Sequence, residues 1–241
     1  MIKINRSSTP PESLEKEKKK KTGSYRKQDV HDKLQQDFHN KCYICESKPM
    51  MSREVEHLRP HHKAEFGSEY WGRKFDWENL FLSCRHCNLV KSERENILDC
   101  CKEDPEEFLL QKLEGDSVVV RPKDEENVSA VATAKLIQDA FMAEKPAARR
   151  LDANDRRKLL QEEVLHITKT LDQYRHARKR SKRKAELFET LRQMVQLDQA
   201  YAGFLRTEVR EMQGRCNELA ELLSIEEQQN KNDSAETEVL A

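Results

Sequence analysis

The chain has 241 residues, and its 44 Lys and Arg balance 44 Asp and Glu to a formal net charge of +0. Hydrophobic residues make up 36% and charged residues 37%, which argues against one large apolar core. We therefore expect a small core assisted by a metal, together with long helices that expose charged faces. The sequence contains neither a signal peptide nor a run of the roughly 18 apolar residues that a membrane span needs, so we expect a soluble, cytoplasmic protein.

Residues 1–29 form a polar, basic segment that contains a lysine-rich run from Lys16 to Lys21. Within it, we interpret Met1 to Thr22 as a solvated, mobile arm, with contact to DNA or to a partner protein as the alternative. A short amphipathic helix is predicted next, because Val30, Leu34 and Phe38 recur at a spacing of four residues.

Four of the seven cysteines form two Cys-x-x-Cys pairs, Cys42 with Cys45 and Cys84 with Cys87. In a reducing cytoplasm, such pairs favour metal binding over disulfides. Four thiolates close a tetrahedral shell and leave no open position, as expected of a structural Zn²⁺. The competing interpretations are two unrelated pairs of buried cysteines, or His86 as a ligand in place of one thiolate.

Between and just after these pairs lie Glu56-His57, Asn79 and Asn88. In this order the residues resemble the HNH endonuclease family. The resemblance implies an α+β, mostly helical fold, with a ββα-metal core in a treble-clef-like frame of four cysteines around zinc, followed by a helical C-terminal region. We place this nuclease domain at residues 30–99.

Hydrolysis of a phosphodiester needs an activated water and neutralisation of the developing charge on the phosphate. His57 suits the general base, because the pKa of histidine lies near working pH. The resemblance implies that Glu56 and Asn88 hold a catalytic divalent ion and that Asn79 fixes the loop that aims His57. Where the family pattern has a final histidine, the amide oxygen of Asn88 favours Mg²⁺ or Mn²⁺ over Zn²⁺.

Each of these residues also has a plainer interpretation. His57 alone would be a structural or surface histidine, and Arg59, Arg85 and Lys91 are either phosphate contacts or solvated side chains. His61 and His62 follow the motif and are weaker candidates for DNA contact. Trp71 and Trp77 are interpreted as core residues.

A longer set of residues is similar to the HNH branch that contains the PtuB nucleases of Septu-type and retron-associated anti-phage systems. It comprises Cys42-Tyr43-Ile44-Cys45-Glu46, Glu54 to Pro60, Trp77-Glu78-Asn79-Leu80, Leu82-Ser83-Cys84 and Cys87-Asn88. The resemblance implies a bacterial defence nuclease that works beside a PtuA-like ATPase of the ABC/SMC type. In the retron version, a reverse transcriptase and its DNA–RNA product would control the complex.

The rest of the chain is predicted as a connector (100–129) with a short strand from Ser117 to Arg121, and a helical region (130–225) for partner or DNA binding. That region should contain one helix from Ala130 to Met142 and long helices between Asp155 and about Glu211. An acidic, disordered tail (226–241) is expected to end the chain.

The most basic stretch runs from Arg175 to Lys184 and is placed on a helix, where some of its charges must face solvent. Within it, Arg178 and Arg180 are candidate contacts to DNA phosphates, with a solvated face or partner docking as alternatives.

The leading hypothesis from the sequence is therefore an endonuclease acting on DNA, with RNA as a further substrate to consider. A zinc-binding adaptor that holds nucleic acid or protein without catalysis is the alternative from another class. A stand-alone restriction-type enzyme is disfavoured, because the chain shows no separate base-reading domain.

Overall fold

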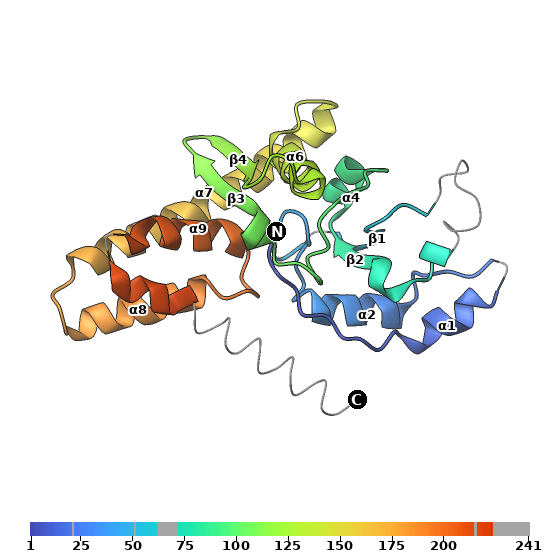
Figure 1. Cartoon of the computed structure of the whole chain (residues 1–241), viewed down its shortest axis with the longest axis horizontal. Coiled ribbons are helices and arrows are strands. Elements are labelled where there is room, and N and C mark those ends of the chain that lie inside the picture. Colours follow the sequence, from blue (N-terminus) through green and yellow to red (C-terminus); the bar gives the residue numbers. More distant parts are fainter. Residues whose placement is uncertain (21, 51, 62–71, 215, 224–241) are drawn as a thin grey trace.

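A computed structural model describes residues 1–20, 22–50, 52–61, 72–214 and 216–223. It consists of helices around two small antiparallel sheets, which confirms the mostly helical α+β class (Figure 1). Three sequence-based expectations fall outside the described residues: those for His62, for Trp71 and for the tail 226–241. No helix in the described part of the chain combines the length and the apolar character that crossing a membrane requires.

The first sheet and the helix that follows it form the expected ββα unit. Strand β1 (Glu54–His57) pairs antiparallel with β2 (Leu80–Ser83), and helix α4 (Arg85–Lys91) begins directly after Cys84. A short 3-10 helix, η2 (Trp77–Asn79), leads into β2. Helix α2 (Gln28–Asp37) packs against this sheet. The unit therefore carries Cys84 at the start of α4 and places Asn88 one turn further along it.

The connector contains a complete β-hairpin rather than a single strand. After the short helix α5 (Pro105–Phe108), strand β3 (Leu109–Glu114) pairs with β4 (Ser117–Pro122) across a turn in which Gly115 has a φ of 60°. Strand β4 matches the predicted one, whereas β3 was missed because its sequence, LLQKLE, does not alternate between apolar and polar residues. Helix α6 (Val128–Met142) covers this hairpin.

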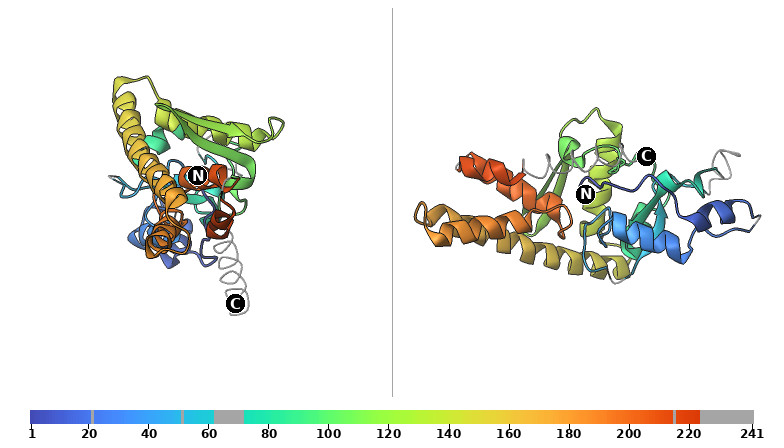
Figure 2. Two further views of the ribbon diagram at one scale, coloured as in Figure 1. Left: turned by 90° about the vertical axis from the view of Figure 1, so that its left-hand side faces the viewer. Right: turned by 90° about the horizontal axis from the view of Figure 1, so that it is seen from below.

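The C-terminal region is a helical arm built along one long helix. Helix α7 (Ala147–His176) packs against α8 (Lys182–Met194) and α9 (Ala202–Gln213), and η3 (Asn217–Leu219) follows. Figures 1 and 2 show α7 running from beside the end of the molecule that carries the ββα unit to the opposite end. The apolar stripe expected from the sequence is buried along α7, at Leu160, Val164, Ile167 and Leu171.

The basic stretch is not helical throughout, as the sequence analysis had it, but contains the turn between α7 and α8. Helix α7 ends at His176, and α8 starts at Lys182 after Ser181, whose hydroxyl accepts a hydrogen bond from the backbone N–H of Lys184 at 3.1 Å. A serine at this position is a strong signal for a helix start, and it divides the charges between a turn and two helix ends.

The N-terminal segment is packed onto the fold, so the expectation of a solvated, mobile arm is wrong for its described residues. Helix α1 (Glu12–Lys18) is formed, and the side chains of Ile2, Ile4 and Leu14 are fully or almost fully buried. Arg6 lies over the ring of Trp77, 4.4 Å from its centroid. A few apolar residues spaced among many charges suffice to pack this segment onto the fold, which a composition-based interpretation overlooks.

One continuous apolar core joins the ββα unit to the helical arm. Phe141 of α6, for example, lies 5.6 Å from Phe204 of α9, measured between ring centroids. A polar contact also joins the ββα unit to α6: Nε2 of His86 on α4 makes a hydrogen bond of 2.9 Å with the carbonyl oxygen of Ala140.

Candidate metal centre and active site

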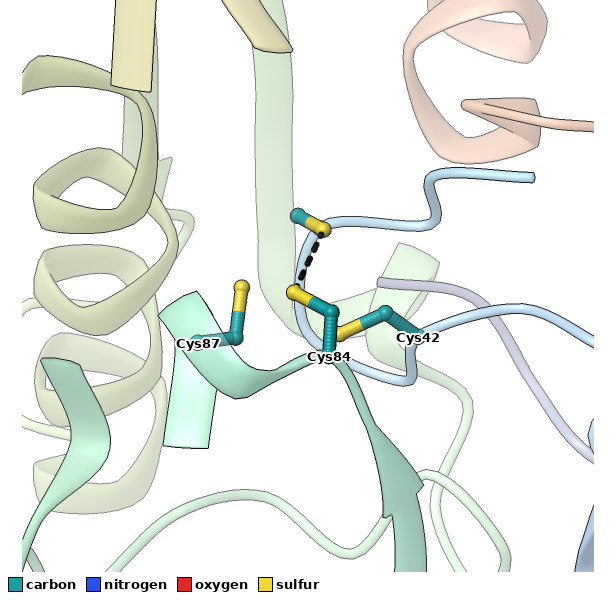
Figure 3. A group of neighbouring side chains, drawn as sticks. Cys42, Cys84 and Cys87 are labelled. Atoms are coloured by element: carbon teal, nitrogen blue, oxygen red, sulfur yellow. Dashed lines mark hydrogen bonds between the residues drawn. The ribbon is translucent and has the colours of Figure 1, made fainter. Parts of the chain in front are cut away.

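The four cysteines of the two Cys-x-x-Cys pairs converge on one point. Their sulfur atoms all lie within 4.8 Å of one another, and all four side chains are buried. Figure 3 shows Cys42, on the loop before β1, facing Cys84 and Cys87 at the start of α4. Within the described residues, this is the one cluster of at least three His, Cys, Asp or Glu side chains whose geometry could hold a metal ion.

The donor set fits a structural zinc ion. Zn–S bonds of about 2.3 Å in a tetrahedron put the sulfurs about 3.8 Å apart, and Sγ of Cys45 lies 4.0 Å from Sγ of Cys84. His86 is not part of the set, because its Nε2 contacts Ala140 and its Nδ1 lies 3.4 Å from a carboxylate oxygen of Asp152.

Groups around the cysteines act on the thiolate form in both directions. Nη2 of Arg156, on α7, lies 3.1 Å from Sγ of Cys84 and donates to it. Hydrogen bonds from the neighbouring thiols hold the pKa of Cys45 well below its usual range, whereas burial raises the pKa of Cys42 and Cys87. Metal ligands must be deprotonated, so a bound cation would itself have to stabilise part of the thiolate charge. Arg156 was not singled out by the sequence, since only the fold brings α7 against the zinc frame.

A cavity of about 230 Å³ lies beside β1 and the start of α4. It is lined by residues from four parts of the chain, namely Tyr25, Arg26, Val55, Glu56, His57, Pro60, His61, Asn88, Ser92 and Glu93. Three of the sequence-predicted residues, Glu56, His57 and Asn88, thus share one cavity. They come from β1 and α4, which the zinc frame holds together.

His57 is held in the cavity by contacts on several sides. Its Nε2 lies 3.1 Å from the carbonyl oxygen of Lys74, which can only accept a hydrogen bond, so Nε2 carries a proton. The ring of Tyr25 lies 4.5 Å away at an interplanar angle of 79°, and the ring of His61 lies 3.9 Å away.

Asn79 ties the loop after β1 to the segment before β2. Its Oδ1 accepts from the backbone N–H of Arg59 at 2.8 Å, and its Nδ2 donates to the carbonyl oxygens of Arg59 at 2.9 Å and Arg73 at 3.1 Å. Because the side chain is buried and all three contacts are to backbone, it restrains the chain two residues after His57.

Glu56 and Lys91 form a buried ion pair under the cavity. Nζ of Lys91 lies 2.9 Å from Oε1 of Glu56 and donates to the carbonyl oxygen of His57 at 2.7 Å. Burial raises the pKa of Glu56, and the ammonium of Lys91 opposes that shift. The prediction that Lys91 contacts phosphate is not supported, because its side chain is fully buried beneath β1.

Asn88 is half-buried at the edge of the cavity. Its Nδ2 donates a hydrogen bond to Oε2 of Glu54, so the amide nitrogen is directed towards β1. An asparagine whose nitrogen is engaged in this way has its oxygen as the remaining donor atom for a cation.

A comparison with protein families matches residues 42–94 to the model of the HNH endonucleases. The chain therefore contains an HNH endonuclease domain, a phosphodiester hydrolase. No curated protein and no solved structure matches the chain. The match begins at the first zinc cysteine and ends three residues beyond α4, so it covers the zinc frame and the ββα unit but not the helical arm.

Other candidates lie at different distances from the HNH cavity. Arg59 is exposed and lines a separate cavity of about 190 Å³ behind Asn79. Arg178 and Arg180 lie in the turn between α7 and α8, at the far end of the helical arm from the HNH domain (Figure 1). Arg59, Arg178 and Arg180 are not among the residues that line the cavity with His57.

The N-terminal segment contributes more to the HNH cavity than the sequence analysis assigned to it. Residues 1–29 were described as a polar, basic arm, yet Tyr25 and Arg26 line the cavity, and the Arg26 guanidinium lies 5.1 Å from the centroid of the Tyr25 ring. His61 was a weak candidate for DNA contact and is buried against His57. An aromatic–arginine pair just before a helix that leads to the first zinc cysteine was the available signal.

Proposed function

We propose that this chain is a divalent-metal-dependent endonuclease that cleaves DNA with His57 as its general base. The observation that supports this most is the shared cavity, in which a histidine, a carboxylate and an amide from two elements meet an arginine from the N-terminal segment. A zinc adaptor without catalysis would not need this set around one hollow.

In this proposal, Nδ1 of His57 takes a proton from the attacking water, because Nε2 is committed to the carbonyl of Lys74. Asn79 is a positioning residue that keeps the loop after β1 in place. Arg26 is exposed at the rim of the cavity, where its guanidinium suits a phosphate oxygen.

Glu56 and the Asn88 oxygen would hold the catalytic ion, and Mg²⁺ or Mn²⁺ fits such oxygen donors. Mg²⁺ commonly uses only one or two protein carboxylates together with water and substrate phosphate, so this small set is adequate. When bound, the ion neutralises charge on the phosphate and on the leaving oxygen. Lys91 holds Glu56 in place from below, which leaves the second carboxylate oxygen for the ion.

The test is cleavage of supercoiled plasmid and single-stranded DNA with Mg²⁺ or Mn²⁺, by the chain alone and with any ATPase encoded beside it. His57→Ala should lower the rate about 10²- to 10⁴-fold, the usual contribution of a general base. His166→Ala is the matched control, because His166 is exposed on α7.

Both variants should retain bound zinc, which shows that the fold is intact. Equal cleavage by His57→Ala and wild type would contradict the assignment of the base. Absence of cleavage under every condition would favour the adaptor.

We further propose that the nuclease is the effector of an anti-phage complex with an ABC/SMC-type ATPase. The support is the run of residues shared with the PtuB-like branch, from Cys42 to Asn88. Stable co-purification of the two proteins is the expected result. A nuclease fully active without that ATPase and unable to bind it would contradict this role.

A further inference from the structure

The turn between α7 and α8 carries a group of cations that the catalytic proposal does not use. Arg178, Lys179 and Arg180 follow one another there and are all exposed. We call these three residues the basic tip. The turn lies at the opposite end of the molecule from the HNH domain (Figure 1 and the right-hand view of Figure 2).

Among the described residues, the basic tip has no ion-pair partner, although Lys179 is close enough to Glu218 to help lower the pKa of that carboxyl. In the described part of the chain, no carboxylate lies within ion-pair distance of any of its three side chains, whereas several neighbouring cations do have acidic partners. Lys184, for example, lies 3.3 Å from Glu218, and Lys182 lies 3.8 Å from Glu186. The uncompensated charge is therefore concentrated in the turn.

A cavity of about 420 Å³ adjoins the tip. Lys179 and Arg180 line it together with Tyr174 and Phe188, whose ring centroids are 6.0 Å apart. Glu218 also lines the cavity, but its carboxylate is already engaged by the Tyr174 hydroxyl at 2.5 Å and by Lys184. Two cations at the edge of a hollow suit the phosphate oxygens of a nucleic acid.

We propose that the basic tip is a second nucleic-acid contact, which binds the phosphate backbone of the duplex at a distance from the scissile bond. This inference rests on the proposed nuclease function and adds a binding site to it. Because phosphates are read as point charges, the contact increases affinity for any sequence and does not select one.

The length of α7 sets the scale of the arrangement. Arg156 contacts the zinc frame, and from there to His176 the helix extends about 30 Å at about 1.5 Å per residue. That distance corresponds to about nine base pairs at 3.4 Å each. A duplex that follows α7 from the cysteine cluster to the basic tip is therefore about one helical turn long or longer.

The experiment measures binding in the full-length His57→Ala chain, so that no cleavage is required. The probe is a fluorescein-labelled duplex of about 30 base pairs, followed by fluorescence anisotropy over a series of salt concentrations. Changing Arg178, Lys179 and Arg180 together to Gln should weaken binding on the order of tenfold. It should also reduce the slope of log affinity against log salt by up to about 2.7, since each phosphate contact contributes about 0.9.

Three comparisons distinguish an effect of the basic tip from the general effect of removing positive charge. Changing Lys135, Arg150 and Lys158 to Gln removes the same charge from exposed positions on α6 and α7 and should alter the affinity less than about twofold. Arg178→Lys with Arg180→Lys keeps the charge and should retain the affinity. On a duplex of about eight base pairs, too short to reach both places, the tip variant should bind as the parent does.

An unchanged affinity and salt slope in the tip variant would overturn the inference and leave the tip to an acidic protein partner or to solvent. Equal weakening by the control triple variant would overturn it too. If His57→Ala still cleaved DNA while the tip variant bound it weakly, the catalytic proposal would fail and the tip would stand.

Discussion

At the residue scale, the pair of Lys91 and Glu56 combines structure with the proposed chemistry. The Lys91 side chain is fully buried, and the pair sits directly under the cavity that contains His57. Removing a charge from water is costly unless a partner compensates it, so each member depends on the other. The pair also connects α4 to β1, because Lys91 donates to the His57 carbonyl.

We expect Lys91→Met to lower the free energy of unfolding by about 3–5 kcal/mol, because it leaves the Glu56 carboxylate buried without its partner. Urea denaturation measures the change. Lys91→Met combined with Glu56→Gln should recover much of the loss in stability but none of the cleavage, since the proposed metal ligand is gone. A double variant as unstable as Lys91→Met alone would show that packing, not charge, dominates at this position.

At the scale of elements, α7 supports the zinc frame from outside the HNH domain. The Arg156 guanidinium donates to Cys84, and the nearby thiolates raise the pKa of this arginine although burial opposes the shift. Hydrogen bonds to metal ligands commonly tune affinity by 10- to 100-fold. The helical arm therefore contributes to the metal centre as well as to the core.

We expect Arg156→Met to weaken zinc binding about 10- to 100-fold, measured by competition with a chromogenic chelator. Arg157→Met is a matched control, because the adjacent arginine is also half-buried but contacts Met142 and Asn154. Equal zinc affinity in the Arg156 variant and wild type would show that the thiolates alone determine the site.

A second contact at this scale holds the N-terminal segment near the cavity. The carboxylate of Glu17, at the end of α1, accepts from Lys20 at 2.5 Å and from the backbone N–H of Ser24 at 2.9 Å. These hydrogen bonds lower the pKa of Glu17 from 4.5 to about 2. Because the folded value is the lower one, the contact stabilises the segment above pH 4.5 and loses its effect as pH falls towards 2.

Glu17→Gln should therefore destabilise the protein near neutral pH, and the difference from wild type should shrink at about pH 3. Urea denaturation at the two pH values tests this. Glu12→Gln, at an exposed position of the same helix, provides the control and should have the smaller effect at neutral pH. A difference that grows on acidification would contradict the assigned sign.

At the scale of the whole molecule, the apolar core does not divide between the HNH domain and the helical arm. Buried residues from α2, β2, α6, α7 and α9 form one cluster. Further links are made by ion pairs such as that of Arg206 on α9 with Glu106 on α5, at 2.8 Å. A shared core makes the two parts depend on each other for stability.

We expect the chain to unfold in one cooperative transition. Both tryptophans, Trp71 and Trp77, lie in the nuclease part of the sequence, whereas far-UV circular dichroism is dominated by α6 to α9. Thermal unfolding followed by the two signals should give one midpoint, and removal of zinc by a chelator should lower both together. Two separate midpoints would show that the arm folds independently.

How much the sequence predicts depends on how local each signal is. The helix before Cys42, strand β4 and helix α6 follow from short-range patterns and were found within a few residues. The break between α7 and α8 was missed because the charges around Ser181 obscured its role as a helix cap. The N-terminal segment was misjudged because its few apolar residues gain meaning only through distant partners, as when the N–H of Ile4 donates to the carbonyl of Cys100.

The sequence by itself determined the four cysteines of the candidate metal site, the order of Glu56, His57, Asn79 and Asn88, and the helical character of the C-terminal half. Such features depend on spacing along the chain, which folding does not alter. Only the tertiary structure decided that Lys91 is buried under Glu56 rather than offered to phosphate, that Arg156 reaches Cys84 and that Arg26 borders the cavity. The contact of Lys91 with Glu56 joins residues 35 positions apart, and that of Arg156 with Cys84 joins residues 72 positions apart. Packing of the shared core brings these distant residues together.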